Sequence, residues 1–175
     1  MAEVTFNTTD GQTIARELLI LYLNVGTYAA PVWAAIGKRV EDSAAEYDWG
    51  ENTSQDILGV THSSMKKPVI TQSFDGVKLS KGDTAYEKIW AEGIKNQNPQ
   101  ALCNLDLLAV HFYASSASAR FAERYPSSMV RPTSIGGEGG DNIVMPIEAT
   151  YGGEREVGTV AKDEHTGAIT FTRTA

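Results

Sequence analysis

The chain has 175 residues, of which 42% are hydrophobic and 21% are charged, and this is the size and composition of one ordinary globular domain. Its 15 basic and 22 acidic side chains give a formal charge of -7. A negative field repels the phosphates of nucleic acids, so the composition disfavours a DNA-binding protein. It is compatible with a surface past which DNA moves without adhering. We expect a single domain over residues 1–175.

The single cysteine and the short apolar runs indicate in which cellular compartment the protein is made. Cys103 is the only cysteine, which excludes an intrachain disulfide and a cluster of cysteine ligands within one chain. The longest apolar run, Leu18–Leu23, is too short to cross a bilayer and lacks the basic lead and cleavage site of a signal peptide. We therefore expect a protein that is cytosolic when made and has no membrane partner.

The N-terminal part of the chain predicts a β-hairpin. Residues 17–25 are apolar and fit both helix and strand templates, because the run is short. Asn24 and Gly26 end this run, and a second apolar segment follows over residues 31–40. Two extended segments joined by a short loop are the better interpretation.

An acidic segment follows. Residues 41–56 carry six acidic and no basic side chains together with several turn-forming residues, which indicates an exposed excursion. Short strands are predicted over residues 57–61 and 68–74, and we expect this pair to form a second hairpin.

One α-helix is predicted in the middle of the chain. Thr84 and Glu87 match a capping box, and apolar residues then recur at three-to-four spacing until Asn98 and Pro99 end the helix. No other segment has a helical pattern of this strength.

The C-terminal half predicts strands. Residues 105–112 are apolar on both faces, as expected of a central strand, and residues 142–151 alternate cleanly. Pro146 places the second of these strands at a sheet edge or at an irregularity. Residues 154–162 and 168–174 read as a closing hairpin. About seven strands and one helix indicate a mainly β protein, either a sandwich or a barrel.

Catalytic and metal-binding motifs are not apparent. His62, His111 and His165 are scattered singly, and the glycine cluster at residues 136–140 leads into a strand rather than a helix, which indicates a loop. Cys103 stands at the start of an apolar strand and is expected to be an inert packing residue. The acidic segment lacks the ligand alternation of a calcium loop. We expect no metal, no cofactor and no enzymatic activity.

The tryptophans indicate packing rather than ligand binding. Trp33 and Trp90 are expected in the core or at an interface, because a large ring buries much area wherever it lies. Trp49 lies within the acidic segment, where an exposed aromatic ring is costly. We therefore predict that Trp49 packs against another subunit.

Four stretches, in this order, carry a resemblance to a known family: TFNTTDGQTIARELLILYLNVGT, PVWAAIGKRVEDSAAEYDWGENTSQDILG, MVRPTSIGGEGGDN and MPIEATYGG. Together they cover nearly the whole chain with the helix around Trp90 and the closing hairpin. The sequence resembles the major tail proteins, or tail tube proteins, of long-tailed bacteriophages and of prophages in Gram-positive bacteria. None of the stretches is a catalytic signature.

The resemblance implies a tail-tube-like β-sandwich or half-barrel with one flanking helix. Copies of the chain would form stacked, hexameric rings and a hollow tail tube through which genomic DNA passes without specific binding. The implied partners are other copies, the tail tape measure, the tail terminator and the distal tail proteins. The implied location is the virion tail, with assembly in the host cytoplasm. Contractile tails, tailocins and secretion systems use the same architecture. The resemblance therefore does not identify which of these assemblies contains the protein.

The resemblance also implies where subunits touch. Residues 44–67 correspond to an extended acidic loop that reaches the next ring. The candidate contact residues are Tyr47, Asp48, Trp49, Asp56, Ile57 and Leu58. The alternative function is a monomeric β-barrel that binds a small ligand in an internal cavity, and an enzyme without a recognised motif ranks third.

Overall fold

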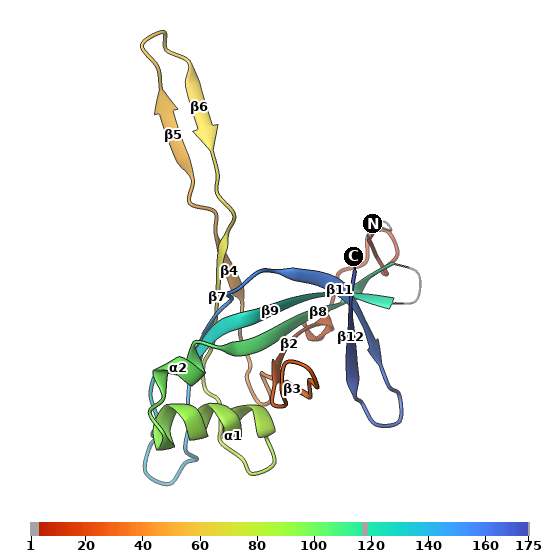
Figure 1. Ribbon diagram of the computed structural model, residues 1–175, viewed down its shortest axis with the longest axis vertical. Helices are drawn as coiled ribbons and strands as arrows, with labels where there is room; N and C mark the ends of the chain where they lie inside the picture. Colours follow the sequence, from red (N-terminus) through yellow and green to blue (C-terminus); the bar gives the residue numbers. More distant parts are fainter. Residues whose placement is uncertain (1–3, 117–118, 175) are drawn as a thin grey trace.

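The protein is described by a computed structural model over residues 4–116 and 119–174. A curved antiparallel sheet carries a helix near one end, and a long hairpin projects from the other end (Figure 1). The twelve strands in these residues are β1 (Thr5–Phe6), β2 (Leu19–Asn24), β3 (Trp33–Ala35), β4 (Ala45–Asp48), β5 (Asn52–Gln55), β6 (Thr61–Ser64), β7 (Val69–Phe74), β8 (Leu105–Ser116), β9 (Ala119–Pro132), β10 (Ile147–Thr150), β11 (Glu156–Lys162) and β12 (Ile169–Arg173). The predicted mainly β fold with a flanking helix is confirmed.

The helical segments are α1 (Thr84–Trp90), which continues into a π-helical turn over Ala91–Lys95, the short α2 (Pro99–Leu102), and a 3-10 turn over Arg16–Leu18. Helix α1 starts where the sequence predicts, but the capping box does not form. The residue before the helix is Asp83, and Glu87 Oε1 accepts a hydrogen bond from the Gly82 N–H at 2.9 Å.

The predicted helix end at Asn98 and Pro99 is instead the start of α2. Asn98 Oδ1 accepts a hydrogen bond from the Ala101 N–H at 3.2 Å, and Pro99 occupies the first helical position. This is the usual arrangement of an N-cap followed by proline, because proline has no N–H to leave unpaired. The same two residues therefore end one helical segment and begin the next.

Strands β8 and β9 form the spine of the sheet. The strand order is β3-β2-β8-β9-β10-β7-β4, and β11 with β12 branches from the other half of β9. Residues 120–124 of β9 pair with β11, whereas residues 129–132 pair with β10. Pro126, which has no N–H to donate, lies between the two branches, and the register with β8 shifts there.

Sequence reasoning assigned no strand to residues 119–132. The alternation in this segment is broken by Pro126 and by charged residues that are buried in the structure, including Glu123 and Arg124. Gly152 approaches the branch closely, since a Cβ on it would collide with the Ser127 carbonyl oxygen. Glycine at that position lets the chain leave β10 and turn toward β11.

Strand β8 lies in the middle of the sheet, as predicted. Leu105, Leu107 and Ala109 face an apolar layer that includes side chains of α1, β7 and β10. Leu108 and Val110 face a second layer shared with β11 and β12. The two-sided apolar pattern therefore reflects two layers of core, one on each face.

Both predicted terminal hairpins are confirmed, since β2 pairs with β3 and β11 pairs with β12. Pro146 lies directly before β10, which has a partner strand on each side. Of the two alternatives for this proline, the structure shows the irregularity and not the edge.

The prediction for Cys103 is wrong. The residue is exposed at the end of α2 instead of packed in β8. The short helix α2 takes up the preceding residues, so that the buried strand starts only at Leu105.

A buried polar cluster ties the loop between β2 and β3 to the sheet. Arg124 donates from Nε to Asp106 Oδ1 at 3.0 Å and from a terminal nitrogen to Oδ2 at 2.6 Å. Its guanidinium also lies 4.0 Å from the centre of the Tyr28 ring, and Asn24 Nδ2 donates to Asp106 at 3.0 Å. Charged groups this deeply buried are tolerated because each one is paired.

We predict that Leu107→Ala lowers the free energy of unfolding by about 3 kcal/mol, because Leu107 is fully buried and the substitution leaves a cavity. Chemical denaturation at a concentration too low for association measures this loss. The matched control is Leu58→Ala, which removes the same atoms from an exposed residue and should change stability by less than about 0.5 kcal/mol. Equal losses in both variants would contradict the placement of the core.

Candidate functional site

The projecting hairpin, residues 44–67, is here called the arm. At its base β4 pairs with β7 in the main sheet, and farther out β5 pairs with β6 in a separate two-stranded sheet. The Lys66 N–H donates to the Trp49 carbonyl at 2.9 Å and joins the two parts. Every residue from 51 to 67 is exposed, and the arm stands clear of the body (Figure 1). Beyond its base, where Ala45 packs against the core, the arm therefore adds nothing to the core of its own subunit.

This arrangement corrects the prediction for the segment. The expected strand over residues 57–61 is wrong, because residues 56–60 form the turn at the tip. The expected hairpin between residues 57–61 and 68–74 is replaced by one long hairpin. The apolar pair Ile57 and Leu58 resembles a strand in sequence, yet neither side chain is buried in the chain itself.

The tip is a turn organised by one carboxylate. Asp56 Oδ1 accepts hydrogen bonds from the N–H groups of Leu58 and Val60, each at 2.9 Å. Asp56 Oδ2 lies 3.0 Å from His62 Nε2. Gly59 closes the turn with a φ of 80°, a conformation that favours glycine. A turn with this many internal bonds is preorganised. Binding therefore costs little further conformational entropy, because the turn is already ordered in the free chain.

The turn displays two large apolar side chains. Ile57 is fully exposed and Leu58 is 83% exposed, although leucine and isoleucine are among the residues most often found inside proteins. Their backbone is held by Asp56, so they cannot fold back onto the arm without breaking the turn. Exposed apolar groups on a preorganised element are typical of an interaction site.

The bonds of the turn also act on the pKa of the Asp56 carboxyl. The hydrogen bond from His62, together with the N–H groups of Val60 and Leu58, holds the pKa of Asp56 below its usual value. A lowered carboxyl pKa means that the charged group stabilises the turn at every pH above the ordinary value. That contribution is lost as the pH falls through the lowered pKa.

A second exposed group lies near the base of the arm. The rings of Tyr47 and Trp49 stack with their centres 6.3 Å apart, and each is nearly half exposed, at 47% and 45%. Met65 on the returning strand is also exposed. The partner predicted for Trp49 therefore has an accessible ring to contact, and that contact stays a prediction.

The six candidate contact residues fall into two groups. Tyr47, Asp48 and Trp49 lie near the base of the arm, while Asp56, Ile57 and Leu58 form the tip. Sequence reasoning missed Val60, Met65 and His62, which belong to the same exposed hairpin. The pairing of β5 with β6 would have placed these three residues on the hairpin. The strand predicted over residues 57–61 excluded that pairing, because it put a strand where the turn lies.

Beyond its base the arm carries two acidic side chains, Glu51 and Asp56, and no Lys or Arg. Glu46 and Asp48 lie at the base, where Lys66 and Lys67 also lie. The surface presented beyond the base therefore combines apolar side chains with negative charge.

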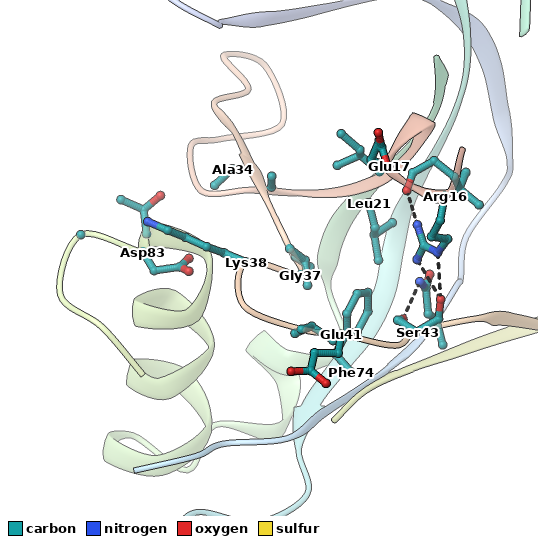
Figure 2. A pocket seen from close by; sticks show the side chains of 18 residues that line it. Arg16, Glu17, Leu21, Ala34, Gly37, Lys38, Glu41, Ser43, Phe74 and Asp83 are labelled. Carbon is teal, nitrogen blue, oxygen red and sulfur yellow. Dashed lines mark hydrogen bonds between the residues drawn. The ribbon is translucent and has the colours of Figure 1, made fainter. Parts of the chain in front are cut away.

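A cleft of about 700 Å³ opens between β2, β3, the loop before β4 and the start of α1 (Figure 2). Arg16 donates to the carbonyls of Ser43 and Leu19 at 2.8 and 2.6 Å, so its guanidinium is already bonded to the wall. The Ser43 hydroxyl donates to the Ser73 carbonyl at 2.7 Å and accepts from Gln72. No histidine or cysteine is among the described residues that line the cleft.

Within the described residues, neither a cluster of metal ligands nor a membrane-spanning helix is present. Within residues 4–116 and 119–174, no three histidine, cysteine or acidic side chains come together as metal ligands. His111 lies 2.8 Å from the Tyr113 hydroxyl and 3.2 Å from Glu123, as part of a strand-face network. In the same part of the chain, no helix combines the length and apolarity needed to cross a bilayer.

Comparison with known proteins gives the following similarities. No protein-family model matches the chain, and no curated protein matches it. Among solved structures, the tube-terminating cap of the anti-feeding prophage is similar, with 14% identity, 87% of this chain and 95% of that chain covered, and a TM-score of 0.48. The sheath/tube terminator of the extracellular contractile injection system PVC has 11% identity, 85% and 99% coverage and a TM-score of 0.48. A chain of the PVC sheath-tube complex has 10% identity, 94% and 95% coverage and a TM-score of 0.45. Similarity at this level assigns the chain to no family.

We predict that Asp56→Ala loosens the tip without unfolding the body. The substitution removes the acceptor of the Leu58 and Val60 N–H groups, so both amides should exchange with solvent at least about tenfold faster. Hydrogen exchange read by NMR measures this, with the amide of Leu107 in β8 as the internal reference. Unchanged exchange at Leu58 and Val60 would show that the carboxylate does not hold the turn.

Proposed function

We propose that the protein is a structural subunit that assembles with copies of itself into stacked rings, forming a hollow tube of the kind built by tail tube proteins. The observation that carries this proposal is the preorganised tip of the arm, with Ile57 and Leu58 exposed. A monomer gains nothing from such a tip. A neighbouring subunit that covers it gains about 1.5–3 kcal/mol for each buried side chain.

Stacking multiplies this small gain. A ring presents one arm per subunit, so contacts between two rings form together and the later ones are effectively intramolecular. An interface that is weak for one pair of chains can thus be firm between rings. This accounts for an arm with few large apolar groups.

The edges of the sheet support lateral association within a ring. Among the described strands, β4 and β12 each have a partner on one side only, as do both strands of the outer arm. An uncovered edge invites pairing with another chain, and a rotation that closes into a ring satisfies every copy. We infer that these edges are the joints of the ring.

The finer parts of the proposal follow the sequence resemblance. The rings are hexameric, and the tube belongs to a virion tail or a related injection machine that is assembled in the host cytoplasm. Its partners are the tail tape measure, tail terminator and distal tail proteins. The net charge of -7 suits a lumen through which DNA passes without specific binding. The protein acts without a metal or cofactor and is not an enzyme.

The cleft of about 700 Å³ is the feature that favours the alternative, a small-ligand-binding protein. It lies within the volume range of ligand sites, but it opens at the surface and its lining mixes charges of both signs. The residues that would enclose a barrel cavity, such as Leu107 and Val130, are fully buried in side-chain packing instead. We therefore rank assembly first.

We predict that the purified protein forms rings and hollow tubes as its concentration rises, and that shortening the arm abolishes tubes. The short-arm variant replaces residues 50–65 with an Asn-Gly turn, which joins the two positions that already share a hydrogen bond, Trp49 and Lys66. Negative-stain electron microscopy is the measurement, and circular dichroism checks that the body stays folded.

A matched pair of charge variants locates the effect. Ile57→Asp with Leu58→Asp places two charges at the tip and should raise the concentration needed for tubes at least about tenfold, because the charges must be desolvated at the interface. Thr53→Asp with Ser63→Asp adds the same charge to exposed positions lower on the arm and should have a smaller effect. If wild type stays monomeric at every concentration, the assembly proposal is wrong and ligand screening of the cleft becomes the next step.

A further inference from the structure

A second apolar surface lies beside α1. It is a pocket of about 410 Å³, lined by Leu79, Lys81, Tyr86, Trp90, Ala91 and Lys95, among others. Tyr86 and Trp90 are one helical turn apart and form neighbouring parts of the wall. Trp90 is 38% exposed, which leaves part of the largest apolar ring uncovered. The pocket has room for two aliphatic side chains, since sites of ~300–1,000 Å³ hold whole drug-sized ligands.

The charge at this pocket is opposite to that of the arm. Lys81 and Lys95 flank it, and neither has a salt-bridge partner among the residues described. The one carboxylate in the lining, Glu87, is directed to the Gly82 N–H. Two ammonium groups around an apolar floor match an acidic arm that ends in Ile57 and Leu58.

The arm and the pocket lie at opposite ends of the molecule. Figure 1 shows the outer strands β5 and β6 at one end of the long axis and α1 at the other end. A chain therefore cannot fill its own pocket. Two different surfaces at opposite ends form a heterologous contact, which extends as an open stack when it is repeated by a second copy and a third.

We propose that the pocket beside α1 receives the tip of the arm from a second copy of this chain. Ile57 and Leu58 enter between Leu79 and Trp90, and the acidic outer arm lies against Lys81 and Lys95. This inference rests on the proposed function, because it names the receiving surface of the arm in the stacked assembly. The contact fixes the polarity of the stack, since every arm points the same way.

The larger cleft is the less suitable receptor for the arm. Its lining contains three carboxylates, those of Glu17, Glu41 and Asp83, against two cations, Lys38 and Arg16. The guanidinium of Arg16 is already bonded to backbone carbonyls. An acidic arm entering there meets like charge, which disfavours binding. The charge of the lining therefore favours the pocket beside α1 over the cleft as the receptor of the arm.

Disulfide crosslinking tests the contact in the full-length protein. The exposed Cys103 is first replaced by serine, and Leu58→Cys is combined with Lys95→Cys. Because each copy then carries one thiol at each end, mild oxidation of stacks should give a ladder of dimers, trimers and longer species on a non-reducing gel. Each single-cysteine variant can give dimers at most. In the control pair, Lys95→Cys is combined with His165→Cys, an exposed position in the β11–β12 turn, and should give no ladder.

Charge reversal gives a second readout. Lys81→Glu with Lys95→Glu should raise the concentration needed for stacking at least about tenfold, and adding Glu51→Lys on the arm should recover part of that loss. Stacks that form normally but give no ladder with Leu58→Cys and Lys95→Cys would overturn this inference and leave the proposed function intact. Absence of stacks from the wild-type protein would overturn both.

Discussion

The pairing of β8 with β9 is the interaction on which the rest of the structure depends. Both strands are long, and β9 carries β11 on one half and β10 on the other. The division occurs at Pro126, where no N–H is available and the register shifts, so neither neighbour can pair along the whole strand. The sheet curves around two apolar layers as a result, and its outer strands are left with free edges.

The same constraint separates stability from assembly. Apolar burial is concentrated around the spine, in side chains such as Leu107, Leu108 and Val130, and the cluster of Arg124 with Asp106 fixes the neighbouring loop. The arm leaves this body through β4 and β7 and contains no fully buried residue beyond its base. Substitutions in the outer arm are therefore expected to have little effect on the fold.

The arm compensates for its lack of a core with local hydrogen bonds. Asp56 binds two backbone N–H groups and His62, so the turn is held although no tertiary contact covers it. This order is what turns exposed Ile57 and Leu58 into a defined surface rather than a mobile tail. The pocket beside α1 and the tip of the arm lie at opposite ends of one chain. In the directional stacking that we propose, the pocket of one copy receives the tip of another.

The sequence by itself determined the strand-rich composition, the terminal hairpins, the start of α1 and the central strand β8, because each has a strong local pattern. It also indicated the exposed acidic segment that forms the arm, and the six contact residues on it stay candidates. Only the tertiary structure identified β9, whose charges are paired after folding, and the tip turn, in which Ile57 and Leu58 imitate a strand. The exposure of Cys103 likewise depended on whether α2 formed. Local pattern reports what a segment can bury, whereas pairing between distant residues decides what it does bury.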